Sequence, residues 1–318
     1  MPLIPEYLSK NNATNSHITV IGGANRDIMG KATESLVEQS STPGKVSSST
    51  GGVGKNIAHN MGLLGVTTKF ISAVGDDSGG KKIINELYQN QVDTNNFIVS
   101  NNTPTGTYLS ILDENNDLYT AIADMEILKN LSPWYMVEIK ETITTSKFII
   151  ADTNLHTDTL AEICKICAEQ QIKLLIDPVS AAKASKLNGL LPAIDIITPN
   201  ITELEIITDR SIQTEDDLIT AATELNYAGT ELVITTMGDQ GIYVSHPEIS
   251  DFFSPKLAEI VNTTGAGDAF NAGLIFGLLN QQSLANSINT ALEASKYTIA
   301  NPNSVNPDLP ALLRRKIK

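Results

Sequence analysis

The sequence predicts an α/β protein with a mostly parallel central sheet and a small second β-sheet. Short apolar runs alternate along the chain with stretches of helical character, which is the pattern of repeated strand–helix–strand units. Runs such as LLID (174–177) and LVIT (232–235) are almost continuously apolar and suit strands that are buried on both faces. The 318 residues, of which 41% are hydrophobic, suffice for one large domain of this kind.

The expected strands and helices of the large sheet follow one another along most of the chain. Because helices separate the strands, the strands can run parallel and place their carboxyl ends at one edge, where α/β proteins bind ligands. Strands are expected at residues 17–21, 68–73, 147–151, 173–176, 194–198 and 232–235, and helices at residues 55–64, 80–90, 157–170, 202–207, 215–226 and 267–279.

Two segments break this alternation and predict the second sheet. Residues 28–50 and 105–126 are rich in Thr, Ser, Asn and Asp, and the second segment alternates like a hairpin that turns at 114–117. We expect these segments to project as a small β-sheet from a single domain that spans residues 17–312. Residues 1–16 are expected to form a mobile tail.

The charge of the chain excludes two classes of partner. With 22 Lys and Arg against 36 Asp and Glu, the net charge is −14, so nucleic acid and anionic membrane surfaces repel the chain. No stretch reaches the roughly 20 apolar residues of a membrane-spanning helix. Residues 1–16 also lack the basic start and apolar run of a secretory signal. We therefore expect a cytoplasmic protein that acts on a small molecule.

The segment Gly265-Ala266-Gly267-Asp268 carries the strongest chemical signal. Small residues at a helix start leave backbone N–H groups free to bind an anion, and the positive end of the helix dipole favours this. Asp268 adds a carboxylate beside the anion site, which is the combination needed to deprotonate a hydroxyl and to hold a transferring phosphoryl group. The alternative is an ordinary helix start that Asp268 caps.

Two segments at strand ends are candidates for a nucleotide site. Asn200 and Glu203 follow the expected strand 194–198, where Glu203 can organise Mg²⁺ through water. The alternative for this pair is a capping box, in which Asn and Glu only start a helix. Thr236 opens the sequence T-x-G-x-x-G, which forms either a turn over a nucleotide or a simple hairpin.

Two glycine-rich segments near the N-terminus, 22–27 (GGANRD) and 51–56 (GGVGKN), also follow or precede expected elements. Neither has the spacing of a dinucleotide-binding fingerprint. The second is not a P-loop, because Ser49 stands where the first glycine is needed and Asn56 replaces Ser or Thr. Asn and Asp side chains beside exposed backbone instead suit the recognition of sugar hydroxyls.

Taken in this order, the segments GGANRD, GGVGKN and GAGD resemble the ribokinase-like, or phosphofructokinase-B, family of sugar and nucleoside kinases. The resemblance covers residues 17–312 and implies a three-layer α/β/α domain with a β-sheet lid over the acceptor. It also implies an enzyme that transfers phosphate from ATP, with Mg²⁺, to an alcohol group. Such an enzyme works by positioning its substrates and stabilising charge.

The resemblance assigns a role to each matching residue. Asp268 corresponds to the catalytic base, the N–H groups of Gly265, Ala266 and Gly267 correspond to the anion hole, and Glu203 corresponds to the residue that holds Mg²⁺ through water. The acceptor-side positions are Asn25, Asp27, Lys45, Gly51, Gly52 and Asn56, and the nucleotide-side positions are Asn200, Glu203, Thr236, Gly238, Gly241 and Thr264.

Within this family the chain is most similar to the pseudouridine kinases, above all in residues 107–127 and 148–154. This similarity implies phosphorylation of the 5′-hydroxyl of pseudouridine to pseudouridine 5′-phosphate. Pseudouridine has a ring N–H that uridine lacks, so a fixed acceptor at Asp124 or Asn154 would select for it. The expected base or sugar contacts are Tyr108, Ser110, Asp124 and Asn154.

Two other functions stay open on the sequence alone. The chemical residues are shared across the family, so the acceptor can also be inosine, uridine, ribose or a related sugar. A non-catalytic regulator that binds a nucleoside or sugar on the same fold is the alternative of another class. Such a binder has no physical need for a base beside an anion hole.

Two further expectations concern ions and assembly. Asn262 stands where many family members carry Asp, in a loop associated with monovalent cations, and this loss of charge argues against activation by K⁺. The expected lid has free strand edges and an apolar face, and two lids that pair would cover both. We therefore expect a homodimer that forms through the lid.

Overall fold

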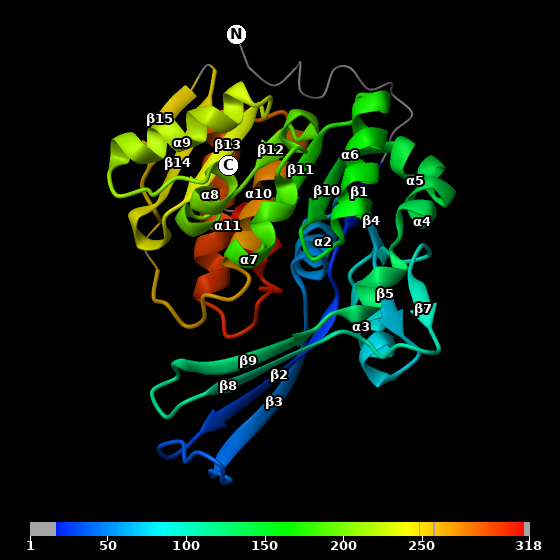
Figure 1. Ribbon diagram of the computed structural model, residues 1–318, viewed down its shortest axis with the longest axis vertical. Coiled ribbons are helices and arrows are strands. Elements are labelled where there is room, and N and C mark those ends of the chain that lie inside the picture. Colours follow the sequence, from blue (N-terminus) through cyan, green and yellow to red (C-terminus); the bar gives the residue numbers. More distant parts are fainter. Residues whose placement is uncertain (1–16, 248, 257, 315–318) are drawn as a thin grey trace.

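The computed structural model in Figure 1 describes residues 17–247, 249–256 and 258–314, so the expected tail at 1–16 lies outside the described residues. Its centre is a nine-stranded sheet with the order β15-β14-β13-β12-β11-β10-β1-β4-β6, parallel except for β13–β14 and β14–β15. The strands are β1 (His17–Ile21), β4 (Thr68–Ile71), β6 (Val92–Asp93), β10 (Ser146–Asp152), β11 (Leu174–Asp177), β12 (Ile196–Ile197), β13 (Leu232–Thr236), β14 (Ile242–His246) and β15 (Ile249–Phe253).

Helices cover both faces of this sheet, which confirms the predicted three-layer α/β/α architecture (Figure 1). One face packs on the buried side chains of α4 (Pro133–Glu138), α5 (Lys140–Thr144), α6 (Thr157–Gln170), α8 (Ile201–Thr208) and α9 (Glu215–Tyr227). The other face packs on α2 (Val53–Leu63), α3 (Ser78–Gln89), α10 (Ala266–Leu279) and α11 (Leu284–Ile299). The remaining helices are α7 (Ala181–Ala184) and α12 (Leu309–Arg314).

The second sheet corresponds to the expected lid and is called the lid below. It extends away from the large domain (Figure 1). It has four strands in the order β3-β2-β8-β9, and the β8–β9 hairpin turns where the sequence predicts. Its strands are β2 (Asn25–Ala32), β3 (Gly44–Gly51), β8 (Thr107–Leu112) and β9 (Leu118–Asp124). A two-stranded sheet of β5 (Ala73–Gly75) and β7 (Ile98–Ser100) lies beside α3.

The register of the lid defines its two faces. Asp27 aligns with Ser49 of β3 and with Tyr108 of β8, and Met29 aligns with Ser110. Since aligned residues share a face and successive residues alternate, Asn25, Asp27, Tyr108 and Ser110 lie on one face, which we call the inner face. The outer face carries Ile28, Val46, Leu109, Ile111 and Ile122.

Within the described ranges, no helix combines the length and the apolar composition that a membrane crossing requires.

Close packing of α10 on α11 gives a first prediction. A Cβ at Gly273 would lie 2.9 Å from the Ala291 Cα and the Ala294 Cβ. Alanine favours a helix over glycine by about 1 kcal/mol, but overpacking costs typically 1–3 kcal/mol. We therefore expect Gly273→Ala to lower the free energy of unfolding by about 1 kcal/mol, measured by urea denaturation. Gly267→Ala is the matched control, since no atom lies within 4 Å of its added Cβ. Equal stability of the two variants would contradict this account.

Candidate active site

Most of the predicted site residues lie at the carboxyl edge of the large sheet, beside the root of the lid. The loops that follow β10, β12 and β13 and the first turns of α2, α8 and α10 supply those of the large domain, and β2, β3, β8 and β9 supply those of the lid. The strands run parallel, so these loops all emerge at the same edge. The lid joins the large domain here through Asn25, Gly51 and Asp124.

Asp268 lies in the first turn of α10 and is 8% exposed. Its Oδ2 accepts a hydrogen bond of 2.7 Å from Asn56 Nδ2 of α2. Burial raises the pKa of Asp268 to about 7; the Asn56 hydrogen bond opposes this rise, and the charge of Asp152 adds to it. A carboxyl group with this pKa is suited to accept a proton near neutral pH.

The glycines before Asp268 shape the start of α10. Gly265 has φ +84°, and a Cβ there would collide with the Ser304 carbonyl oxygen, so only glycine fits. The helix starts at Ala266 without a side-chain cap, and the space beside Gly267 is open. Ala266 N donates to the Thr263 carbonyl over 3.3 Å, whereas Gly265 N and Gly267 N have no hydrogen-bond partner within the described residues and are available to an anion.

Asp152, at the end of β10, joins three parts of the site. Its fully buried carboxylate accepts the N–H groups of Gly23 (2.9 Å), Gly54 (2.8 Å) and Asn154 (2.9 Å). Burial raises the pKa of Asp152, although these backbone hydrogen bonds favour its charged form. Asp152 is not among the residues predicted from the sequence. An acidic residue at the end of an apolar strand is the pattern that would have indicated it.

The acceptor-side residues lie at the root of the lid. Asn25 Nδ2 donates to Asp27 Oδ1 over 2.6 Å, and the backbone of Gly51 lies against the Asp27 carboxylate. Burial raises the pKa of Asp27, which Asn25 and the charge of Lys55 partly offset. Tyr108 and Ser110 follow along the same inner face.

Lys45 and Asp124, two of the residues expected to contact the acceptor, do not lie at the root of the lid on its inner face. Lys45 aligns with Lys31 near the outer end of the lid. At about 3.3 Å per residue, this is roughly 20 Å along β3 from Gly51. Asp124 aligns with Thr107 and therefore lies on the outer face of the lid, whereas Tyr108 lies on the inner face. Its expected role as a base contact beneath the lid does not match this register, because a sequence alone does not say which face of a strand points inward.

Lys183 fixes the side-chain amide of Asn154. Lys183 Nζ donates to Asn154 Oδ1 over 2.7 Å, and an ammonium group can only donate. Burial lowers the pKa of Lys183, and the charge of Asp152 counteracts this. The Asn154 side chain also favours the charged form of Asp152 through a hydrogen bond, so its amide is held from both ends. Lys183 uses one lone pair of Oδ1 and leaves the second, which keeps Asn154 compatible with the expected role of a fixed acceptor.

On the nucleotide side, the structure contains both the capping box and the hairpin that were expected as alternatives to a nucleotide site. Asn200 and Glu203 form a reciprocal capping box, with Asn200 N to Glu203 Oε2 and Glu203 N to Asn200 Oδ1 each at 2.9 Å. β13 and β14 form a hairpin whose turn contains Gly238 and Gly241, and Thr236 N donates to the Pro199 carbonyl over 2.8 Å. A capping box does not preclude a metal role, because Glu203 Oε1 is not used in it.

The loop before α10 is tied to the loop after α11. Asn262 Oδ1 accepts from Thr264 N, and Asn262 Nδ2 donates to the Pro302 carbonyl, each over 3.0 Å. The amide of Asn262 thus links the two loops and engages one of the carbonyl oxygens that a cation would need.

This fold and this site define a phosphotransferase, in which a buried carboxyl group adjoins a helix start that can hold a phosphoryl group. A family model described as pfkB family carbohydrate kinase matches residues 15–312. The chain therefore belongs to this family and is a sugar or nucleoside kinase, as the resemblance implies.

Individual relatives agree with this assignment. The chain is 33% identical to the pseudouridine kinase of Escherichia coli over 92% of this chain and 93% of that protein, and 25% identical to a guanosine-inosine kinase of Exiguobacterium acetylicum over 92% and 97%. Among solved structures it resembles a carbohydrate kinase from Agrobacterium tumefaciens (TM-score 0.82, 26% identity, 94% and 96% covered). It has the fold of an Arabidopsis thaliana ribokinase complexed with ribose and ATP (TM-score 0.85, 21% identity, 94% and 99% covered).

The pKa of Asp268 gives a prediction for activity. Protonated Asp268 cannot accept a proton, so kcat should fall as the pH drops below about 7. Asn56→Ala removes the donor that favours the carboxylate, which raises the pKa of Asp268 and moves this decline to higher pH. Asn289→Ala, in which a remote α11 asparagine is replaced, should leave the profile in place. A pH profile of kcat that Asn56→Ala leaves unchanged, or moves to lower pH, would contradict the role of this hydrogen bond.

Proposed function

We propose that this protein phosphorylates the 5′-hydroxyl of pseudouridine with Mg-ATP and forms pseudouridine 5′-phosphate. The observation that carries the proposal is the Asn56–Asp268 contact, which places a carboxyl group of raised pKa between the root of the lid and the anion-binding start of α10. The identity to a pseudouridine kinase supports this choice of acceptor.

Three groups of residues would take part in phosphoryl transfer: a base, an anion site and a ribose site. Asp268 takes the proton of the 5′-hydroxyl while that oxygen bonds to the γ-phosphorus and the bond to the leaving ADP breaks. The N–H groups of Gly265, Ala266 and Gly267 bind the charge on the transferring group, for which Ala266 N exchanges the Thr263 carbonyl for a phosphate oxygen. Asn25, Asp27 and Asn56 hold the ribose so that the hydroxyl approaches in line.

The nucleotide side offers oxygen ligands that suit Mg²⁺. Glu203 Oε1 is the oxygen that the capping box leaves available, and the neighbouring carboxyl groups of Asp177 and Asp268 add negative charge. Glu203 would hold Mg²⁺ through water, and the ion would neutralise phosphate charge. Thr236, Gly238, Gly241 and Thr264 would line the ATP side. Because Asn262 already links the two loops, we propose that catalysis does not depend on K⁺.

The base of the nucleoside would lie between the inner face of the lid and Asn154. Asn154 Oδ1 would accept a ring N–H with its second lone pair, because Lys183 fixes the amide in this orientation. Tyr108 and Ser110 are the hydroxyl groups of β8 on the inner face, and either can accept the ring N–H that distinguishes pseudouridine from uridine.

An acceptor panel tests the proposed function. ADP release is measured with Mg-ATP and pseudouridine, uridine, inosine, cytidine, ribose or fructose, in KCl and in a Tris buffer free of Na⁺ and K⁺. We expect turnover chiefly on pseudouridine, at similar rates in both buffers, and at least a 100-fold loss of kcat in Asp268→Asn. Turnover chiefly on another acceptor would show that pseudouridine is not the substrate. No ADP release with any acceptor, in protein that binds ATP, would favour a non-catalytic binder.

The same panel tests the arrangement around the base. Asn154→Leu should narrow the ratio of pseudouridine to uridine turnover, because it removes the oriented acceptor of the ring N–H that uridine lacks. Asp124→Ala is the matched control and should leave the ratio unchanged, because Asp124 lies on the outer face. The reverse pattern would mean that the lid presents its other face to the base.

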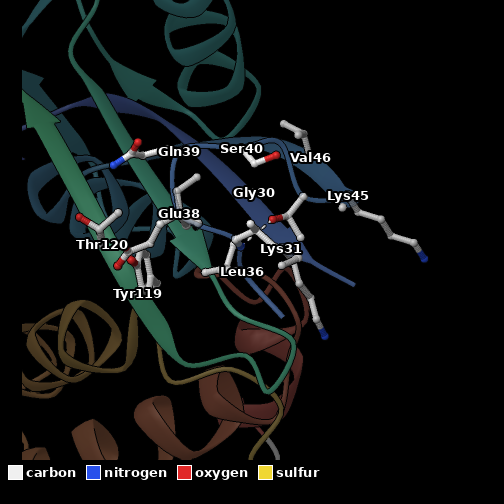
Figure 2. A pocket seen from close by; sticks show the side chains of 15 residues that line it. Gly30, Lys31, Leu36, Glu38, Gln39, Ser40, Lys45, Val46, Tyr119 and Thr120 are labelled. Atoms are coloured by element: carbon white, nitrogen blue, oxygen red, sulfur yellow. Dashed lines mark hydrogen bonds between the residues drawn. The ribbon is translucent and has the colours of Figure 1, made fainter. Parts of the chain in front are cut away.

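We also propose that the protein is a homodimer that forms through the outer faces of two lids. This face carries Val46 and Ile122, which are 78% and 65% exposed, and β3 and β9 form the free edges of the sheet. A hollow of about 660 Å³ opens at the outer end of the lid, where Val46, Leu36 and Tyr119 face it (Figure 2). A second lid would bury these apolar groups and the edges together.

Light scattering tests the assembly. We expect a mass of about twice 34.1 kDa for the wild type and a monomer for the double variant Val46→Asp and Ile122→Asp, which places charges in the interface. Tyr227→Asp changes another exposed apolar residue, on α9, and should remain a dimer. A monomeric wild type, or a double variant that stays dimeric, would refute assembly through this face.

A further inference from the structure

The carboxylate of Glu86, on α3, binds groups from two other elements. Its Oε2 accepts a hydrogen bond of 2.6 Å from Thr50 Oγ1 of β3. Its Oε1 lies 2.6 Å from Lys55 Nζ and 3.2 Å from His59 Nδ1, both of α2. Lys55 is only 2% exposed, so its charge depends on Glu86. We call these four residues the Glu86 cluster.

The Glu86 cluster holds the chain on both sides of a glycine-rich segment. Thr50 immediately precedes residues 51–54 (GGVG), and Lys55 immediately follows them. Gly52 has φ +104°, a conformation that glycine adopts readily, and it alone separates β3 from α2. Glu86 therefore bridges a tight turn between the lid and the large domain.

This segment also connects the two halves of the acceptor site. On the lid side, the backbone of Gly51 lies against the carboxylate of Asp27. On the other side, Gly54 N donates to Asp152 and Asn56 donates to Asp268. The position of Asp27 relative to Asp268 is therefore set across the same few residues that Glu86 bridges.

The charges of Glu86 and Lys55 stabilise each other, so the contact between them is expected to persist. Burial alone would raise the pKa of Glu86, but the contacts with His59, Lys55 and Thr50 outweigh it and hold the pKa well below its usual range. Burial lowers the pKa of Lys55, and the charge of Glu86 opposes this. Hydrogen bonds to an ionised group are stronger than neutral ones, which makes the Thr50 contact a firm link to the lid.

We propose that Glu86 is a positioning residue for the acceptor site, which holds the lid carboxylate Asp27 in register with Asn56 and Asp268 by binding Thr50 and Lys55 across residues 51–54. The inference rests on the proposed acceptor site, and its test can fail independently. Glu86 touches neither substrate in this account. It acts on acceptor binding through Thr50, so its loss should affect the nucleoside and not ATP.

The variant Thr50→Val keeps the shape of the side chain and removes the hydrogen bond to Glu86, while Lys55 stays paired. We expect the KM for pseudouridine to rise about tenfold, with kcat and the KM for ATP within twofold of the wild type. Thr50→Ser retains the hydroxyl and should restore the wild-type KM. Thr220→Val, which removes an exposed hydroxyl of α9, is the matched control and should have no effect.

Calorimetric titration with pseudouridine, and separately with a non-hydrolysable ATP analogue, supplies a readout that does not require turnover. Weaker pseudouridine binding in Thr50→Val alone, at an unchanged Tm, supports the proposal. Unchanged pseudouridine binding, equal loss of both ligands, or no rescue in Thr50→Ser would overturn it. If the wild type neither binds nor turns over pseudouridine, the proposed function fails instead, and the same titrations are repeated with the acceptor that the panel identifies.

Discussion

The acceptor side of the site depends on one buried carboxylate. Asp152 ends β10 and accepts N–H groups from the loop after β1, from the first turn of α2 and from its own loop. A side chain at Gly22 would collide with it, so the backbone can approach only as glycine. Through Gly54 it fixes the start of α2, which carries Asn56 to Asp268. The position of the proposed base, Asp268, therefore depends on the contacts of Asp152 as well as on Asn56.

The same arrangement concentrates negative charge that the protein does not fully balance. Asp177 accepts from Asn271 over 2.7 Å, one turn beyond Asp268 on α10, and burial together with the charge of Asp268 raises its pKa well above the ordinary value. Lys55 is paired with Glu86, and Lys183 binds Asn154. A site of this kind disfavours further bare anions, so it is consistent with the proposal that Mg²⁺ and backbone N–H groups hold the phosphate.

Sequence patterns predicted the elements well and the orientations poorly. Apolar runs and their spacing predicted the parallel sheet, the lid and the strand edge where the site lies, because these depend on local periodicity. They missed α11, although Leu284, Ile288 and Leu292 lie on one buried face at helical spacing, and they missed the antiparallel strands β14 and β15. They also misplaced Asp124 and overlooked Asp152 and Glu86, because the face of a strand and the partners of a buried charge are set by contacts between distant segments.

The central claim is that Asp268 activates the 5′-hydroxyl of a nucleoside held beneath the lid. Phosphorus NMR of the product formed from ATP and pseudouridine tests it most directly, because coupling to protons reveals the phosphorylated carbon. The account predicts a monoester whose phosphorus signal is split by both C5′ protons. A phosphate on another hydroxyl, or ADP and inorganic phosphate as the only new signals, would contradict it.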